Sequence, residues 1–320
     1  MEYMKFAATS IGPKYADKGW RCQDASDTLD FENVRAVAVA DGHGGSNYFR
    51  SEIGSRTAID VVFEQIKLSC KDLTEIERLS ETGIKKFKYD VANEWRRAVK
   101  ADWFKHLQNG KALGEGEIRY ESVKEDYRAY FTSDDPDVVE KYLYSAYGTT
   151  LLCALFTGTQ ILILQIGDGT CMVLQKDGEW SVPIPPDEDN NLNVTASLSS
   201  SKAELKIRHA ILDCENETPN LPAAIFLSTD GLDDCFPYYR NEEHLRKFYT
   251  NVVLGNIMEV GLETTAEEIK NELLEKMTKR FSQDDISMGY LIADDVALLK
   301  EAYDNIDSCY KSSAQKDVNQ

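Results

Sequence analysis

Acidic side chains follow or precede hydrophobic stretches of this chain, in short segments that lie far apart in the sequence. These segments are Gln23-Asp24, Asp41-Gly42-His43-Gly44-Gly45, Gly167-Asp168-Gly169, Asp230-Gly231-Leu232-Asp233-Asp234 and Asp284-Asp285-Ile286-Ser287. Carboxylates that gather in a folded protein repel one another unless a cation neutralises them. A divalent metal ion is the simplest such partner, because it prefers oxygen ligands. The segments therefore predict a metal-dependent hydrolase.

The segment that begins at Asp41 combines a carboxylate, three glycines and a histidine. The apolar run Val34 to Ala40 predicts a buried strand that delivers Asp41 to a sheet edge, where it can bridge two metal ions. Gly42 has no side chain, so a ligand can approach its backbone closely. His43 would lie beside the ions and could donate a proton to a leaving oxygen. A tight glycine-rich turn with an uninvolved histidine is the alternative interpretation.

Two further acidic segments are expected to join Asp41. Asp230 also follows an apolar run and is followed by glycine, so we expect it to meet Asp41 at one end of a sheet. Asp234 lies one helical turn further along and could add a second carboxylate. Asp284 precedes the predicted strand Ile286 to Ala293, where it can complete the cluster or serve as a turn residue.

The elements that position these residues form two strand-rich blocks with helices between them. The predicted strands are Phe6 to Ser10, Val34 to Ala40, Thr149 to Phe156, Gln160 to Ile166, Thr170 to Gln175, Leu205 to Leu212, Ala223 to Ser228 and Ile286 to Ala293. The predicted helices are Ser46 to Ser69, Thr74 to Leu107, one or two within Tyr120 to Tyr144, Glu242 to Val253 and Thr265 to Phe281.

This order predicts a single α+β domain over residues 1–307, in which helices cover antiparallel sheets. An enlarged helical block is expected at about residues 46–147. The last residues, 308–320, are polar and are predicted to be a disordered tail.

The composition limits the classes of partner. With 42% hydrophobic and 28% charged residues, the 320-residue chain has the make-up of a globular protein. We find no run of about 18 apolar residues and no secretion signal, so no membrane partner is expected. The formal net charge of -19 argues against nucleic acid, because a phosphate backbone would be repelled. Seven cysteines without a CxxC pair predict free thiols in a reducing cytoplasm.

The order of the acidic segments, with Gly148-Thr149-Thr150 between them, resembles the protein phosphatase 2C family of metal-dependent serine/threonine phosphatases. The resemblance runs from about Ala7 to Ala293. It implies a four-layer sandwich of two antiparallel sheets flanked by helix pairs. It also implies hydrolysis of phosphoserine and phosphothreonine on proteins, with two Mn²⁺ or Mg²⁺ ions. The substrate would be a phosphorylated protein, and the enzyme would oppose a serine/threonine kinase.

The resemblance further implies a set of metal ligands. They are Asp24, Asp41, Gly42, Asp168, Asp230, Asp234 and Asp284. Asp41 and Gly42 match the residues that hold both ions in the family, and Asp230 and Asp284 match residues that bind the first ion. Asp24 would reach the ions through water. Asp168 and Asp234 match positions that help bind a third ion in some bacterial members.

His43 matches the proposed general acid of the family. Arg21 lies near the position of the phosphate-binding arginine but with a shifted spacing, and Lys18 is the alternative. Gln23 replaces an acidic residue of animal members, so no metal bond is assigned to it. These departures leave a second hypothesis open, a catalytically inactive phosphatase-like module that acts as a regulatory sensor. A metal-dependent hydrolase of small phosphorylated molecules is the third.

Overall fold

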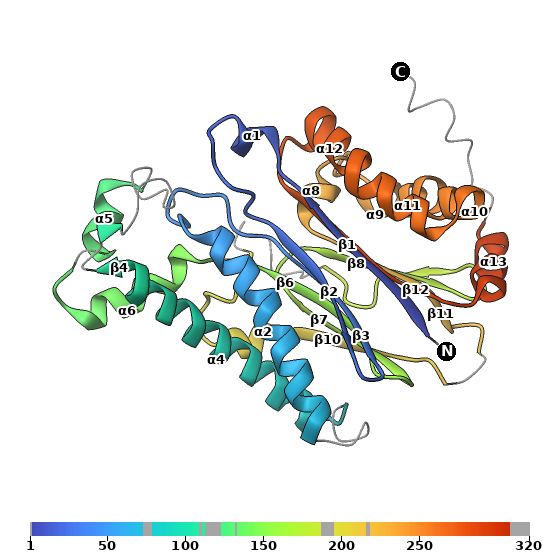
Figure 1. Cartoon of the computed structure of the whole chain (residues 1–320), viewed down its shortest axis with the longest axis horizontal. Helices are drawn as coiled ribbons and strands as arrows, with labels where there is room; N and C mark the ends of the chain where they lie inside the picture. The colour runs from blue at the N-terminus through green and yellow to red at the C-terminus, as the bar shows by residue number, and fades with distance from the viewer. Residues whose placement is uncertain are drawn as a thin grey trace.

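Two five-stranded antiparallel β-sheets pack face to face at the centre of the molecule (Figure 1). The computed structural model describes residues 2–72, 79–108, 111–112, 123–131, 133–186, 195–215 and 218–307. The first sheet has the order β1 (Tyr3–Ser10), β12 (Ile286–Ala293), β11 (Pro222–Ser228), β8 (Thr170–Gln175) and β9 (Trp180–Ser181). The second has the order β10 (Arg208–Asp213), β7 (Gln160–Ile166), β6 (Leu151–Phe156), β3 (Val34–Ala40) and β2 (Ala25–Phe31). A small separate hairpin consists of β4 (Leu107–Gln108) and β5 (Lys111–Ala112).

Helices cover the outer face of each sheet (Figure 1). The second sheet packs against α2 (Ser51–Asp72) and α4 (Glu81–His106). The first sheet packs against two long helical segments that contain α9 (Asn241–Phe248), α10 (Gly255–Val260), α11 (Leu262–Glu268) and α12 (Leu274–Met277), with π-helical turns at Tyr249–Leu254, Ile269–Leu273 and Thr278–Ser282. The remaining described helices are α1 (Pro13–Ala16), α5 (Glu125–Phe131), α6 (Pro136–Ala146), α7 (Ala203–Lys206), α8 (Asp230–Asp233) and α13 (Val296–Asn305). The predicted α+β sandwich of two sheets flanked by helices is confirmed.

Strand β3 shows why these layers form. Its side chains alternate between the two faces of the sheet, as the pleat requires. Val37 and Val39 belong to the core between the sheets, whereas Ala36, Ala38 and Ala40 belong to the core under α2 and α4. All five are at most 1% exposed. The predicted burial of this strand on both faces is therefore confirmed, and the small alanines let the helices approach the sheet closely.

The strand register brings the acidic segments to one end of the sandwich. In the second sheet the last residue of β3, Ala40, pairs with Ala25 at the start of β2. In the first sheet Ser228 at the end of β11 pairs with Thr170 at the start of β8. Residues just beyond these strand ends are therefore neighbours, although they are far apart in the sequence.

Three local features differ from the sequence predictions. The helix predicted from Ser46 begins only at Ser51. Residues 46–50 form turns instead, and their backbone hydrogen bonds are not those of a helix. In particular, the Arg50 amide donates to the Ala146 carbonyl oxygen, at 2.8 Å. Strand β2 was not predicted, since its sequence Ala-Ser-Asp-Thr-Leu-Asp-Phe is polar, as an edge strand can be. Helix α13 was also missed.

The described part of the chain contains no helix that is both long and apolar enough to cross a membrane. Six cysteines in that part are free, in agreement with the predicted thiols. The predicted disordered tail at 308–320 lies outside the described residues.

Candidate metal centre

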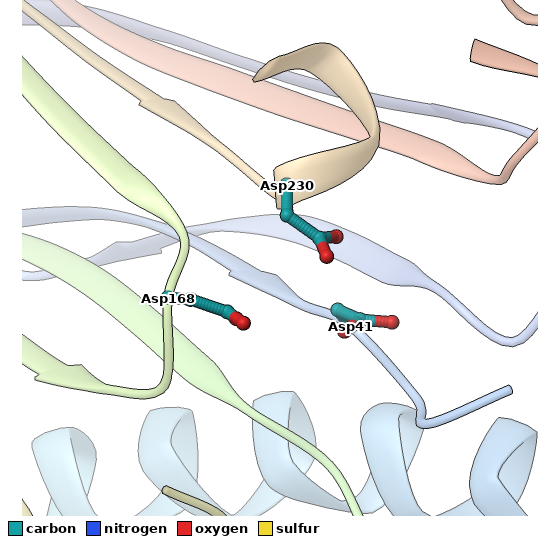
Figure 2. A group of neighbouring side chains, drawn as sticks. All are labelled: Asp41, Asp168 and Asp230. Atoms are coloured by element: carbon teal, nitrogen blue, oxygen red, sulfur yellow. The ribbon is translucent and has the colours of Figure 1, made fainter. Parts of the chain in front are cut away.

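Three carboxylates from three different elements converge at the end of the sandwich (Figure 2). Asp41 directly follows β3, Asp168 lies in the turn between β7 and β8, and Asp230 is the first residue of α8. One carboxylate oxygen of each residue lies within 4.8 Å of the others. The structure thus brings together two residues predicted to share one cluster and a third, Asp168, that was assigned to a separate ion.

The Gly-Thr-Thr segment holds the backbone of Asp41 in place. The Asp41 amide donates to Thr150 Oγ1 at 2.9 Å, and the Asp41 carbonyl oxygen accepts from Thr149 Oγ1 at 2.9 Å and from the Thr150 amide at 2.8 Å. Gly42 is buried and forms a β-bridge with Thr149. A Cβ atom on Gly42 would collide with the carbonyl oxygen of Gln23. The glycine is therefore required for close packing of two backbones.

Similar close approaches fix the other two carboxylates. Gly167 has a φ of +111°, a conformation that favours glycine, and it turns the chain between the two strands beside Asp168. Asp168 Oδ2 accepts a hydrogen bond from Thr195 Oγ1 at 2.6 Å, whereas Oδ1 is buried without a hydrogen-bond partner. A Cβ atom on Gly231 would collide with the carbonyl oxygen of Asp285, so the start of α8 packs directly on the chain before β12.

These carboxylates are costly to ionise together. Burial raises the pKa of Asp41, and the charges of Asp230, Asp24 and Asp168 raise it further. Burial also raises the pKa of Asp230 to about 7, with Asp168 as the strongest charged neighbour. A pKa raised in this way means that the ionised form is destabilised in the folded protein.

The arrangement fits a divalent cation. All donors in the group are carboxylate oxygens, the ligand type that suits Mg²⁺ and Mn²⁺. The unpartnered Oδ1 atom of Asp168 supplies a buried acceptor that a cation could satisfy. The ligand type and the unpartnered acceptor therefore fit a site for Mg²⁺ or Mn²⁺.

An open cleft of about 580 Å³ lies over the three carboxylates, and His43 lines it with them. The His43 amide donates to the Gly148 carbonyl oxygen at 3.0 Å. Its ring packs edge-on against Tyr48, with 4.8 Å between the ring centroids. Burial lowers the pKa of His43, and the charge of Asp168 acts in the opposite direction.

The other predicted site residues are placed differently. Asp284 lines the cleft, where its Oδ2 atom forms an ion pair with Lys14 at 2.9 Å. Asp24 is only 8% exposed and accepts a hydrogen bond from Thr229 Oγ1 at 2.7 Å. Asp24, Gly42, Asp234 and Arg21 are not among the described residues that line the cleft, and the last two are exposed.

Sequence reasoning assigned no role to Asp285, and it missed Lys14 and Thr195. Asp285 is 3% exposed and accepts hydrogen bonds from the amides of Gly12 and Gln23, at 2.7 and 2.6 Å. It therefore ties the N-terminal loop to the chain before β12. Gly12 and Pro13 indicate a turn just before Lys14, but no motif indicated that the lysine would face the acids.

Comparisons with known proteins agree with this geometry. Residues 11–278 match the family model described as Protein phosphatase 2C. No curated protein matches the chain in sequence. Among solved structures, the serine/threonine phosphatase Stp1 from Staphylococcus aureus is 15% identical with a TM-score of 0.55, and the match covers 92% of this chain and 96% of that one.

Two further solved structures show the same fold. The S. agalactiae serine/threonine phosphatase is 15% identical, with a TM-score of 0.54 and coverage of 91% of this chain and 100% of that one. The catalytic domain of the phosphatase PstP, solved in complex with 2 manganese ions, is 16% identical, with a TM-score of 0.51 and coverage of 92% and 99%. Because the family model spans most of the sequence and the fold agrees, the chain belongs to the protein phosphatase 2C family of serine/threonine protein phosphatases.

Proposed function

We propose that this protein hydrolyses phosphoserine and phosphothreonine monoesters on proteins in a metal-dependent reaction. The observation that carries the proposal is the group of Asp41, Asp168 and Asp230, whose carboxylate oxygens lie within 4.8 Å of one another at the base of an open cleft. A cluster that repels itself in the absence of a cation is expected where metal binding is needed for function.

The proposed site holds two Mn²⁺ or Mg²⁺ ions, and Asp168 and Asp234 are the proposed ligands of a third ion. The proposed ligands are Asp24 through water, Asp41, Gly42, Asp168, Asp230, Asp234 and Asp284. When bound, such ions acidify a water molecule and neutralise the charge that builds on the transferring phosphoryl group. The backbone of Asp41 is fixed by hydrogen bonds to its amide and carbonyl groups, so its carboxylate is positioned at the cleft.

His43 is the proposed proton donor to the serine or threonine oxygen that leaves. It is the one histidine among the described residues that line the cleft. Its backbone bond to Gly148 and its packing against Tyr48 limit the movement of the ring. Asp168 favours the protonated imidazole, which partly offsets the effect of burial. Arg21 remains the residue predicted from the sequence to bind phosphate.

The cellular setting is proposed on separate grounds. The substrate is a phosphorylated protein, and the enzyme opposes a serine/threonine kinase. The free thiols of Cys153 and Cys171, both buried, support a reducing, cytoplasmic location. We further propose that residues 1–307 form one catalytic unit, which is supported by the pairing of β1 with β12, near the two ends of the described chain.

The test is phosphate release from a phosphothreonine peptide with Mn²⁺, with Mg²⁺ and with EDTA. Wild-type protein should release phosphate only with a divalent ion, and Asp230→Asn should abolish the release. Glu267→Gln is the matched control, because Glu267 is an exposed acid on α11. Faster hydrolysis of sugar phosphates or nucleotides than of the peptide would instead indicate a small-molecule phosphatase. Absence of both activity and metal binding would favour an inactive sensor module.

A further inference from the structure

Among the described residues, the cleft over the proposed metal site is lined by one lysine side chain and several acids. Five aspartates line it, and Lys14 is the one lysine or arginine among the described residues that do so. A phosphate dianion that enters this cleft meets carboxylates on several sides, so a nearby positive group would matter for its capture. Neither residue that the sequence suggested for this role lines the cleft: Arg21 is exposed, and Lys18 Nζ lies over the ring of Trp20, 4.5 Å from its centroid.

The backbone around Lys14 is firmly anchored beside the acids. The Lys14 amide donates to the Gln283 carbonyl oxygen at 3.2 Å, and the Gly12 amide donates to Asp285 Oδ1 at 2.7 Å. A Cβ atom on Gly12 would collide with the backbone of Asp284. The following residue, Tyr15, is 3% exposed. The position of the lysine backbone is thus fixed by the same chain segment that carries Asp284.

The side chain of Lys14 has more freedom than its backbone. Its Nζ atom pairs with Asp284 Oδ2 at 2.9 Å and lies 4.9 Å from the centroid of the Tyr15 ring. The side chains of Lys14 and Asp284 are 50% and 33% exposed, so solvent screens the pair and weakens it. An ammonium group on a flexible stem can leave such a partner readily.

We propose that Lys14 is the residue of this cleft that binds the phosphate group of the substrate, and that Asp284 holds the lysine until a divalent ion takes its carboxylate. The inference rests on the proposed function, in which Asp284 is a metal ligand. Once the carboxylate serves the metal, the ammonium group loses its partner and is free to donate to phosphate oxygens. Metal binding and phosphate binding are then coupled through Lys14, and by linkage the coupling acts in both directions.

The proposal can be tested by binding, without turnover. The protein is titrated first with Mn²⁺ and then, in the Mn²⁺-loaded form, with inorganic phosphate, by calorimetry. Lys14→Met should weaken phosphate binding by about tenfold or more, the range expected for loss of a charge-assisted hydrogen bond. It should leave Mn²⁺ affinity equal or tighter, because a competing cation has been removed. Lys14→Arg should restore most of the phosphate affinity, since it keeps the charge.

Matched variants separate this role from general effects of charge. Lys85→Met removes a lysine from an exposed ion pair on α4 and should change neither affinity. Phosphate affinity that is unchanged in Lys14→Met, or that falls only in Arg21→Met, would overturn the proposal. So would loss of Mn²⁺ binding in a folded Lys14→Met protein, since that would indicate a structural role.

The outcome also distinguishes the two proposals from each other. Wild-type protein that binds Mn²⁺ and phosphate but does not cleave the phosphothreonine peptide would contradict the proposed function, while the Lys14 variants would still decide the role of the lysine. Wild-type protein that binds neither Mn²⁺ nor phosphate would overturn both.

Discussion

Replacing Asp230 by asparagine should stabilise the metal-free protein. The pKa of Asp230 is raised from its ordinary value of 3.8 to about 7, first by burial and then by Asp168 and other acids. At pH 8 this corresponds to a cost of about 4 kcal/mol for keeping the side chain ionised in the folded state. Coulomb repulsion gives a cost of similar magnitude, about 3.5 kcal/mol for two like charges 4.8 Å apart at an effective dielectric constant of about 20.

The stabilisation by Asp230→Asn should increase as the pH rises. In the unfolded chain Asp230 loses its proton near pH 4, whereas in the folded protein it keeps the proton up to about pH 7. The folded state therefore binds more protons between these values, and its stability falls as the pH rises through this interval. Because solvent in the open cleft screens the charges, we expect Asp230→Asn to raise the free energy of unfolding by about 2 to 4 kcal/mol at pH 8. At pH 5 the gain should be about 1 kcal/mol.

Urea unfolding in EDTA, followed by tryptophan fluorescence at both pH values, measures this difference. Trp95 and Trp180 are buried, so unfolding should change their emission. Added Mn²⁺ should then stabilise the wild-type protein more than the variant, because a ligand that binds the folded state raises its stability. The reasoning would be refuted if the variant were no more stable than wild type at pH 8. It would also be refuted if the gain in stability at pH 5 were as large as the gain at pH 8. Glu267→Gln should show neither effect.

Three further substitutions test the structure around the site. Asp102→Asn weakens the partner of the buried Arg50 guanidinium, 2.5 Å away, so urea unfolding should show a loss of about 3 kcal/mol. Gly42→Ala introduces a Cβ atom that collides with backbone, so calorimetry should show Mn²⁺ affinity reduced by about tenfold or more. Thr229→Val removes the hydroxyl that donates to Asp24, so the free energy of unfolding should fall by about 1 to 3 kcal/mol in the same urea assay. An unchanged free energy of unfolding in Asp102→Asn or Thr229→Val, or an unchanged Mn²⁺ affinity in Gly42→Ala, would contradict the corresponding argument.

Much of the fold was predictable because hydrophobic patterns are local. The bounds predicted for β3, β7, β8 and β12 agree with the structure to the residue. Each is an apolar run between turn residues, and each is almost fully buried, so burial alone specifies the strand. Strand β2 escaped prediction because it lies at a sheet edge and four of its seven residues are Ser, Asp or Thr, which weakens the local hydrophobic signal.

The site itself was only partly accessible from the sequence. The order of acidic residues at strand ends indicated metal chemistry and the family, and it identified Asp41, Asp168 and Asp230 individually. It could not show that these three are the ones whose oxygens approach within 4.8 Å, nor that Asp284 pairs with Lys14 about 270 positions away.

The sequence by itself therefore determined the strands, the residues at their ends and the class of chemistry, since all of these follow from short-range pattern and residue type. The tertiary structure alone decided that Asp168 joins Asp41 and Asp230 and that Lys14 lines the same cleft. The physical reason is that strand order and register are set by pairing between strands far apart in the sequence, such as β1 with β12 and β3 with β6. A shift of one residue in that register would turn every side chain of a strand to the opposite face.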